Sequence, residues 1–211
     1  MKEYKLPIGC DVPETIILAD GDFPSHPLAL EWLRQCPYVV CCDGAANTYI
    51  RSGRMPEAIV GDGDSLLPDI TERYASLIHS EAEQETNDLS KAFRFCLSQE
   101  RKRITIMGAT GKREDHTIGN VSLLADYMEQ AEVSMMTDYG IFVPIREDSM
   151  FESYIGQQIS VFNMNSTALS AEGLAYPLSV FTNWWQGTLN EALARHFIIR
   201  TEGKVLVFRV F

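Results

Sequence analysis

The feature that most constrains the fold is a set of apolar runs in which hydrophobic residues do not alternate with polar ones. Four such runs lie in the first half of the chain, at residues 15–19, 38–42, 58–60 and 103–107. A strand with one face in water alternates apolar and polar residues, whereas a strand covered on both faces is apolar throughout. The runs therefore predict an α/β domain whose parallel sheet is covered by helices on both faces.

Helical patterns separate the apolar runs. We expect helices at residues 28–35, 45–52, 88–99 and, from Asp115 or Thr117, to about Met128. The helix at 88–99 is the clearest, because its apolar residues fall on one face at i, i+3 and i+4 spacing. Thr86 or Asn87 can cap its first turn.

The pattern changes after residue 131. Short apolar stretches at 133–137, 141–145, 158–162, 196–201 and 205–211 are separated by Gly, Asp, Asn and Ser. Glu202-Gly203, between the last two stretches, is typical of a β-hairpin. This half of the chain predicts a small antiparallel β domain.

Composition excludes several classes of protein. Hydrophobic residues make up 45% of the chain and charged residues 22%, a balance typical of globular proteins. No apolar run approaches the roughly 20 residues of a membrane span, and no signal-peptide core follows Met1, so we expect a cytoplasmic protein without membrane contact. Five cysteines without C-x-x-C pairs argue against a disulfide framework and against a zinc site.

The formal net charge of −11 limits the ligands that the chain can attract. A chain this acidic lacks the broad basic face with which proteins bind nucleic acid. It also repels free phosphate compounds. A phosphate substrate would therefore have to arrive with a metal ion.

Acidic or glycine-rich segments follow all four apolar runs. They are Asp20-Gly21-Asp22, Asp43-Gly44, Gly61-Asp62-Gly63-Asp64-Ser65 and Gly108-Ala109-Thr110-Gly111-Lys112-Arg113-Glu114-Asp115. Ligands of open α/β sheets bind beyond the carboxyl ends of the strands, where these segments would meet. Carboxylates gathered there repel one another, and Mg²⁺ removes that cost while it binds phosphate oxygens. The pattern predicts a magnesium-dependent enzyme that acts on the phosphate chain of ATP.

Each acidic segment taken alone also has a structural explanation. An Asp-Gly pair after a strand is usually a turn, and Asp88 can stabilise the start of its helix through the helix dipole. Asp62 and Asp64, one residue apart after a strand, favour metal binding more strongly. Four acidic strand ends together argue against an accidental origin.

The segment from Gly108 to Arg113 is similar to a phosphate-binding loop. A Walker A motif has four residues between its glycines and Ser or Thr after the lysine, whereas here two residues lie between them and Arg113 follows Lys112. The segment is therefore not a Walker loop. A strand–glycine–helix transition with two cations can still hold phosphate with its backbone N–H groups, and His116 can contact the nucleotide.

Five segments, in this order, resemble the thiamine pyrophosphokinase family: 42–47, 59–65, 84–89, 108–117 and 172–178. Members of that family transfer the diphosphate of ATP to the hydroxyl of thiamine and release AMP. The resemblance covers nearly the whole chain. It implies an α/β domain at residues 1–130 that binds ATP and Mg²⁺, followed by a β-sandwich at 131–211 that binds thiamine. It also implies a homodimer with active sites between subunits.

The resemblance assigns roles to single residues. It places the acidic catalytic site on Asp43, Asp62, Asp64 and Asp88, with Mg²⁺ on Asp62, Asp64 and Asp88. It places ATP on Gly44, Asn47, Thr110, Gly111, Lys112, Arg113, Asp115 and His116. It places thiamine on Gln84, Ser170, Tyr176, Thr188 and Asn190, with the Tyr176 ring stacked on the substrate. Leu189 stands where the family usually has Ser, so Thr188 is expected to supply the hydroxyl instead. In the Asp-x-Asp motif, Gly63 stands between the two acids, where the family often has Phe.

Two other functions remain as alternatives. An aspartyl-phosphatase of the haloacid dehalogenase type also carries Asp-x-Asp after an apolar strand. That motif usually continues with Gly-Thr and lies on the first strand, whereas here two strands come earlier and Ser65-Leu66 follows. The other alternative is a non-catalytic nucleotide-sensing module that uses its β domain as an interaction surface.

Overall fold

The computed structural model describes residues 1–7, 11–81, 83 and 85–211, which form two compact units. The α/β unit ends at Asp138. The β unit comprises residues from Tyr139 to Phe211 together with the N-terminal strand β1 (Lys2–Tyr4). In the described part of the chain, no helix has both the length and the apolar character needed to cross a bilayer.

The α/β unit is built on a parallel sheet with the strand order β7-β6-β2-β3-β4-β5. Its strands are β2 (Thr15–Leu18), β3 (Val39–Cys42), β4 (Ala58–Gly61), β5 (Ile78–Ser80), β6 (Arg103–Met107) and β7 (Glu132–Met136). Every residue of β2, β3 and β4 is buried, as the non-alternating runs predict. The strand order reverses at β2, and such a reversal is where open sheets bind ligands.

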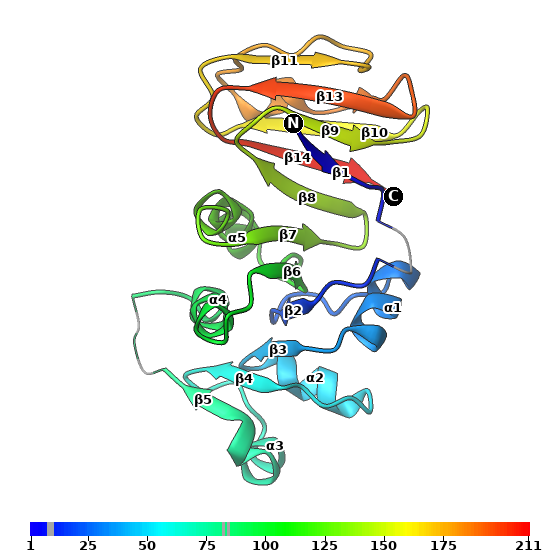
Figure 1. The fold of residues 1–211 in the computed structure, drawn as a ribbon. Helices are drawn as coiled ribbons and strands as arrows, with labels where there is room; N and C mark the ends of the chain where they lie inside the picture. Colours follow the sequence, from blue (N-terminus) through cyan, green and yellow to red (C-terminus); the bar gives the residue numbers. More distant parts are fainter. Residues whose placement is uncertain (8–10, 82, 84) are drawn as a thin grey trace. The chain divides into compact units, whose positions relative to one another are not determined.

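Helices cover both faces of this sheet (Figure 1). The helices α1 (Pro27–Gln35) and α2 (Ala45–Arg51) lie on one face, and α4 (Asp88–Ser98) and α5 (Glu114–Tyr127) lie on the other. The short α3 (Pro68–Arg73) and a 3-10 turn (Ala75–Leu77) lead into β5. Asn87 caps α4, because its side chain accepts a hydrogen bond from the Ser90 N–H.

The β unit is a sandwich of two sheets. One has the order β1-β9-β13-β11 and the other contains β12-β10-β14-β8. The strands are β8 (Gly140–Ile145), β9 (Ser149–Glu152), β10 (Gln158–Asn163), β11 (Leu169–Glu172), β12 (Asn190–Glu191), β13 (His196–Thr201) and β14 (Val205–Val210), with a 3-10 turn at Trp184–Gly187. Phe151 and Phe197 of one sheet and Val161 and Val207 of the other share one buried core. The expected fold class, α/β followed by a β-rich domain, is confirmed.

Two details differ from the expectations. β13 and β14 do not form the hairpin that Glu202-Gly203 suggests, because β13 pairs with β9 and β11 while β14 pairs with β8 and β10. That prediction was wrong: the turn carries the chain from one sheet of the sandwich to the other. In addition, β7 pairs with β6 in the α/β sheet, although it follows the expected domain boundary at residue 130.

Candidate active site

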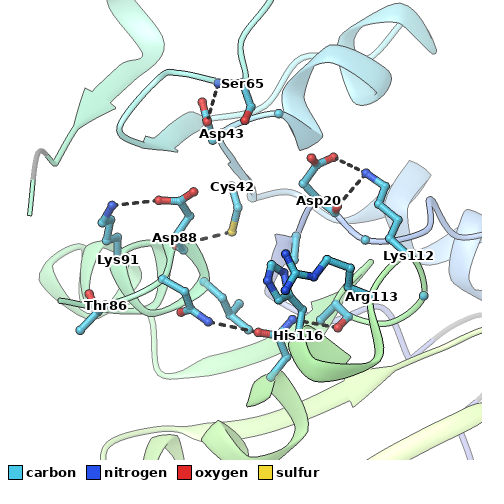
Figure 2. Close-up of a pocket in the computed structure, with 18 of the residues that line it drawn as sticks. Asp20, Cys42, Asp43, Ser65, Thr86, Asp88, Lys91, Lys112, Arg113 and His116 are labelled. Carbon is cyan, nitrogen blue, oxygen red and sulfur yellow. Dashed lines mark hydrogen bonds and ion pairs between the residues drawn. The ribbon is translucent and has the colours of Figure 1, made fainter. Parts of the chain in front are cut away.

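A pocket of about 450 Å³ opens at the carboxyl edge of the α/β sheet (Figure 2). Its walls come from the segments that follow β2, β3, β4 and β6 and from the N-terminal turns of α4 and α5. The predicted site residues among its lining are Asp43, Gly44, Asp62, Asp88, Gly111, Lys112, Arg113 and His116. The parallel topology therefore brings most of the predicted nucleotide and acidic residues of this unit together.

Three carboxylates form a group that can hold a metal ion. Asp43 follows β3, and Asp62 and Asp64 follow the neighbouring strand β4. One ligand atom from each of the three lies within 4.8 Å of the others. Glycine is required at Gly61, since a Cβ there would come within 2.7 Å of the Asp43 Cβ. The spacing suits hard oxygen ligands on a divalent cation.

Asp43 is the buried member of this group, with 3% of its surface exposed. Its Oδ2 accepts a hydrogen bond from the Ser65 N–H at 3.0 Å, whereas its Oδ1 is buried and has no partner among the described residues. Burial raises the pKa of Asp43 most, and the charges of Asp88, Asp62 and Asp64 raise it further, against the lowering effect of the Ser65 N–H. A bare carboxylate is therefore costly here, and a cation would compensate it.

The fourth predicted acid, Asp88, has a different partner. It begins α4, and its Oδ1 accepts a hydrogen bond from the Lys91 ammonium at 3.0 Å. The Lys91 side chain is 3% exposed, whereas that of Asp88 is 34% exposed. The sequence predicts a metal on Asp62, Asp64 and Asp88, but the close group in the structure contains Asp43 in place of Asp88.

The glycine segment between β6 and α5 packs against the end of β2. Gly21 donates its N–H to the Gly108 carbonyl at 2.6 Å, and the Asp22 N–H donates to the Thr110 carbonyl at 2.8 Å. Lys112 has a φ of 55°, in the left-handed region that favours glycine. Its ammonium reaches across to Asp20 and donates to the backbone carbonyl at 2.8 Å and to Oδ1 at 3.1 Å (Figure 2).

Arg113 and His116 line one wall of the pocket, and Asp115 pairs with Arg113. Arg113 makes two hydrogen bonds to the Asp115 carboxylate, from Nε to Oδ1 at 3.0 Å and from a terminal nitrogen to Oδ2 at 2.5 Å. The Arg113 hydrogen bond holds the pKa of Asp115 below its ordinary value. Asp115 is not in the pocket lining, whereas Arg113 and His116 are. Asp115 therefore orients the guanidinium that faces the pocket.

Two predicted nucleotide residues shape loops outside the lining of the pocket. The Asn47 amide donates to the Ser65 carbonyl at 2.8 Å and accepts from the Leu67 N–H at 3.0 Å, which ties the loop after β4 to α2. Thr110 contributes its backbone carbonyl to the contact with Asp22. Both shape loops beside the site, and their contact with a nucleotide stays a prediction.

The predicted thiamine residues belong to the β unit, apart from Gln84, which lies outside the described residues. Asn190 is buried and holds Tyr176 by its backbone: the Tyr176 N–H donates to Oδ1 at 3.0 Å, and Nδ2 donates to the Tyr176 carbonyl at 2.8 Å. The Tyr176 side chain is 64% exposed. Thr188 donates its hydroxyl to the Trp185 carbonyl, and Ser170 is exposed on β11 of the other sheet.

Sequence reasoning missed several residues that line the pocket, chiefly Asp20, Lys91 and Asn120. Asp20 ends the first apolar run, so its position was visible although it received no role. The signal for Lys91 is its i, i+3 spacing from Asp88, which on a helix brings the two side chains together. Asn120 binds the Ala109 carbonyl and the Asn87 amide, two contacts that only the folded chain brings together.

Two family models match the chain. One is described as the catalytic domain of thiamin pyrophosphokinase and covers residues 29–136, and the other as the substrate-binding domain of that enzyme and covers residues 140–208. Thiamine pyrophosphokinase 1 of Oryza sativa is 29% identical over 129 residues, and thiamine pyrophosphokinase of Bacillus subtilis is 34% identical over 86 residues. These alignments cover 49% and 39% of this chain and 49% and 40% of those proteins, so the chain spans about half the length, or less, of the curated relatives it matches.

Solved structures agree in fold. Thiamin pyrophosphokinase from Candida albicans superposes with a TM-score of 0.81 at 18% identity, over 100% of this chain and 93% of that one. The enzyme of that name from Bacillus subtilis superposes with a TM-score of 0.77 at 21% identity, over 93% and 98%. The catalytic-domain model alone spans more than half of the sequence. The chain therefore belongs to the thiamin pyrophosphokinase family.

Proposed function

We propose that the chain transfers the diphosphate of ATP to the hydroxyl of thiamine and releases AMP. The observation that carries this proposal is the juxtaposition, in a member of this family, of an acidic group with a cationic glycine loop. Asp43 and Asp62 line the pocket and form one acidic group with Asp64. Lys112 and Arg113 line the same pocket, and Figure 2 shows them apart from Asp43. Together they suit a phosphate chain that carries a divalent cation.

The acidic group fits Mg²⁺. The buried Oδ1 of Asp43 has no partner in the described part of the chain. One carboxylate oxygen from each of Asp43, Asp62 and Asp64 lies within 4.8 Å of the other two. We assign the ion to these three carboxylates. When bound, Mg²⁺ supplies positive charge to the phosphate oxygens, which this acidic chain would otherwise repel.

The residues of the pocket would then act by positioning and charge. The thiamine oxygen forms a bond to the β-phosphorus, and the bond from that phosphorus to the α,β-bridging oxygen breaks. AMP leaves with the electron pair, and the hydroxyl proton passes to a carboxylate of the pocket. Arg113, oriented by Asp115, and Lys112 balance negative charge on the nucleotide, and backbone N–H groups of the glycine segment hold its phosphates.

The β unit is proposed to bind thiamine and to form a homodimer. Tyr176 offers an exposed ring held by Asn190, and a ring of this kind can stack on the flat, cationic substrate. Exposed apolar side chains gather in the same segment: Tyr176, Val180, Trp184, Trp185, Leu189 and Leu193. A second copy of the chain would cover such a surface.

Incubation with ATP, Mg²⁺ and thiamine, followed by mass analysis, tests the proposal: thiamine diphosphate and AMP should form in equal amounts. Asp62→Asn and Asp64→Asn should each abolish turnover without loss of the fold. Near-normal turnover of both variants at saturating Mg²⁺ would remove the metal assignment. A trapped phospho-aspartate would favour the phosphatase alternative, and ATP binding without AMP release would favour the sensing module.

A further inference from the structure

Arg94 lies on α4 outside the lining of the pocket, yet it bonds to residues that lead into the pocket wall. Its guanidinium donates to Glu81 Oε2 at 2.7 Å, to Glu83 Oε2 at 3.1 Å and to Thr86 Oγ1 at 3.1 Å. Side chains of a helix point back toward its N-terminus, so a long side chain about two turns into α4 reaches the residues before its first turn. Arg94 therefore joins α4 to the chain that precedes it.

Glu83 and Thr86 close this network. The Glu83 carboxylate accepts hydrogen bonds from the Thr86 N–H and from the Thr86 hydroxyl, each at 2.7 Å. The same hydroxyl accepts from Arg94, so the three side chains form a closed ring of hydrogen bonds. The Thr86 hydroxyl lowers the pKa of Glu83, and the hydrogen bond to Glu81 raises the pKa of Arg94. Both groups are therefore charged at neutral pH.

Glu81 connects the network to the sheet. It follows β5 directly, and its N–H donates to the carbonyl of Gly61, the last residue of β4, at 2.9 Å. Asp62 of the acidic group comes next after Gly61. At the other end of the network, Thr86 lines the pocket. One guanidinium thus links the end of the sheet to the pocket wall at the start of α4.

An ordinary surface ion pair would contribute little, because water screens it and both side chains lose conformational freedom. The side chains of Arg94, Glu81 and Glu83 are 44%, 42% and 38% exposed, so their attraction is partly screened. Two features distinguish this network. A single planar guanidinium binds three acceptors, so the freedom of one side chain is lost for three contacts. In addition, one acceptor is a pocket residue. The network should therefore act on the position of Thr86 more than on the stability of the fold.

We propose that Arg94 is a positioning residue: it fixes Thr86, and with it the start of α4, at the wall of the pocket. Thr86 and Asp88 both line the pocket, and Figure 2 shows them on the same side of the site. Displacement of site groups by about 1 Å can cost roughly 100-fold in rate. The effect on catalysis rests on the proposed function, whereas the effect on the position of Thr86 does not.

The structural arm of the test uses metal-free, nucleotide-free protein and amide hydrogen exchange followed by NMR. Arg94→Met removes the donors and keeps an unbranched side chain that favours helix. The N–H groups of Thr86 and Glu81 should exchange at least about threefold faster, because local opening before α4 becomes more frequent. Amides of the buried strand β3 should exchange as before. Unchanged exchange at Thr86 in folded Arg94→Met would overturn the positioning of Thr86.

Arg34→Met is the matched control. It removes the same charge from another helix of the α/β unit, where Arg34 pairs with Glu31 and its side chain is 62% exposed. It should change neither the exchange of Thr86 nor turnover. Glu83→Gln tests the route: in this background, Arg94→Met should accelerate exchange less than it does in the unchanged protein, because both residues act in one network. Fully additive effects would overturn the route through Glu83.

The kinetic arm uses ATP, Mg²⁺ and thiamine. Arg94→Met should lower kcat roughly tenfold while Tm changes little. Arg94→Lys keeps the charge without the planar fork, so it should recover part of the loss. A lower Tm with unchanged kcat would mean a merely structural role and would overturn the positioning role in catalysis. If the unchanged protein formed no thiamine diphosphate, the proposed function would fail, while the amide exchange would still decide whether Arg94 fixes Thr86.

Discussion

At the scale of single residues, Asp43 shows how the site departs from ordinary protein structure. It is buried, it has a φ of 33°, and one of its oxygens lacks a partner within the described residues. A non-glycine residue in the left-handed region and an unsatisfied buried oxygen are both costly. Such strain is concentrated at functional sites, where the surrounding structure maintains it.

Asp43→Asn should therefore stabilise the metal-free fold while abolishing turnover. The pKa of Asp43 lies above its ordinary value of 3.8, chiefly through burial. The folded protein thus holds this proton at a pH where the unfolded chain has lost it, and stability falls as pH rises through the raised folded pKa. In EDTA, the gain in Tm of the variant should be larger at pH 7 than at pH 4. An equal or smaller gain at pH 7 would contradict the buried, uncompensated carboxylate.

Tyr176→Ala tests the residue expected to stack on thiamine. Because the side chain is 64% exposed, its loss should leave Tm nearly unchanged. The thiamine KM should rise about 3- to 30-fold, the equivalent of a lost stacking or cation–π contact, while the KM for ATP stays constant. Tyr139→Ala, which removes a ring that is 78% exposed, serves as the control. A parallel rise of both KM values in Tyr176→Ala would argue against a thiamine contact.

Single residues were predictable where their chemistry follows from position on a strand. Asp43 and Asp62 could be placed in one pocket because parallel strands end at the same edge of the sheet, whereas Asp88, at the start of α4, was placed there by the family resemblance. The roles of Asn47 and Lys91 were not predictable in this way. Asn47 bonds to Ser65 and Leu67 in a loop whose path the sequence does not reveal. Lys91 is a charge on a buried helix face, which a hydrophobic pattern does not predict.

At the scale of elements, the strands and helices of the α/β unit followed closely from the sequence. Buried strands are apolar throughout, and α4 begins at Asp88 behind an Asn87 cap. The short strands β5 and β11 gave no such signal, because they are three and four residues long and partly exposed. The expected hairpin at Glu202-Gly203 failed because a turn signal does not say which sheet the next strand joins.

Gly21→Ala tests the contact between the end of β2 and the glycine segment. A Cβ at Gly21 would clash with the Thr110 and Gly108 carbonyl oxygens, both rigid backbone atoms. The segment would have to move, and we expect a loss of about 1–3 kcal/mol in the free energy of unfolding. The KM for ATP should rise as the loop shifts. Gly119→Ala, within α5 and with open space around its Cβ, should be neutral or stabilising. Equal stability of the two variants would refute the close approach.

At the scale of the whole molecule, the charge distribution is compatible with the proposed binding of a nucleotide by an acidic chain. The net charge is −11, yet three cations, Lys91, Lys112 and Arg113, line one pocket together with the acids. The division into units was predictable from the change of pattern, but its border was not. In the sequence, β7 resembles the short apolar stretches of the β unit that follow it. Only its pairing with β6 assigns it to the α/β sheet.

The proposed homodimer makes a prediction that belongs to the assembly. If each active site takes Asp62 from one subunit and Tyr176 from the other, a heterodimer of Tyr176→Ala and Asp62→Asn contains one intact site and one doubly defective site. Random exchange of subunits makes about half of the dimers mixed, so about a quarter of the original sites should be restored. Activity is measured at a thiamine concentration below KM, where Tyr176→Ala alone is impaired.

Two different affinity tags, purified in sequence, verify the heterodimers, and each variant incubated alone under the same exchange conditions sets the background. The exposed Trp185 and Leu189 of the β unit motivate this arrangement, since a partner would remove their apolar surface from water. Recovery above both backgrounds requires that the two residues act across the subunit boundary. Verified heterodimers without recovered activity would mean that Tyr176 and Asp62 serve the same subunit, because only then does every mixed site retain one defect.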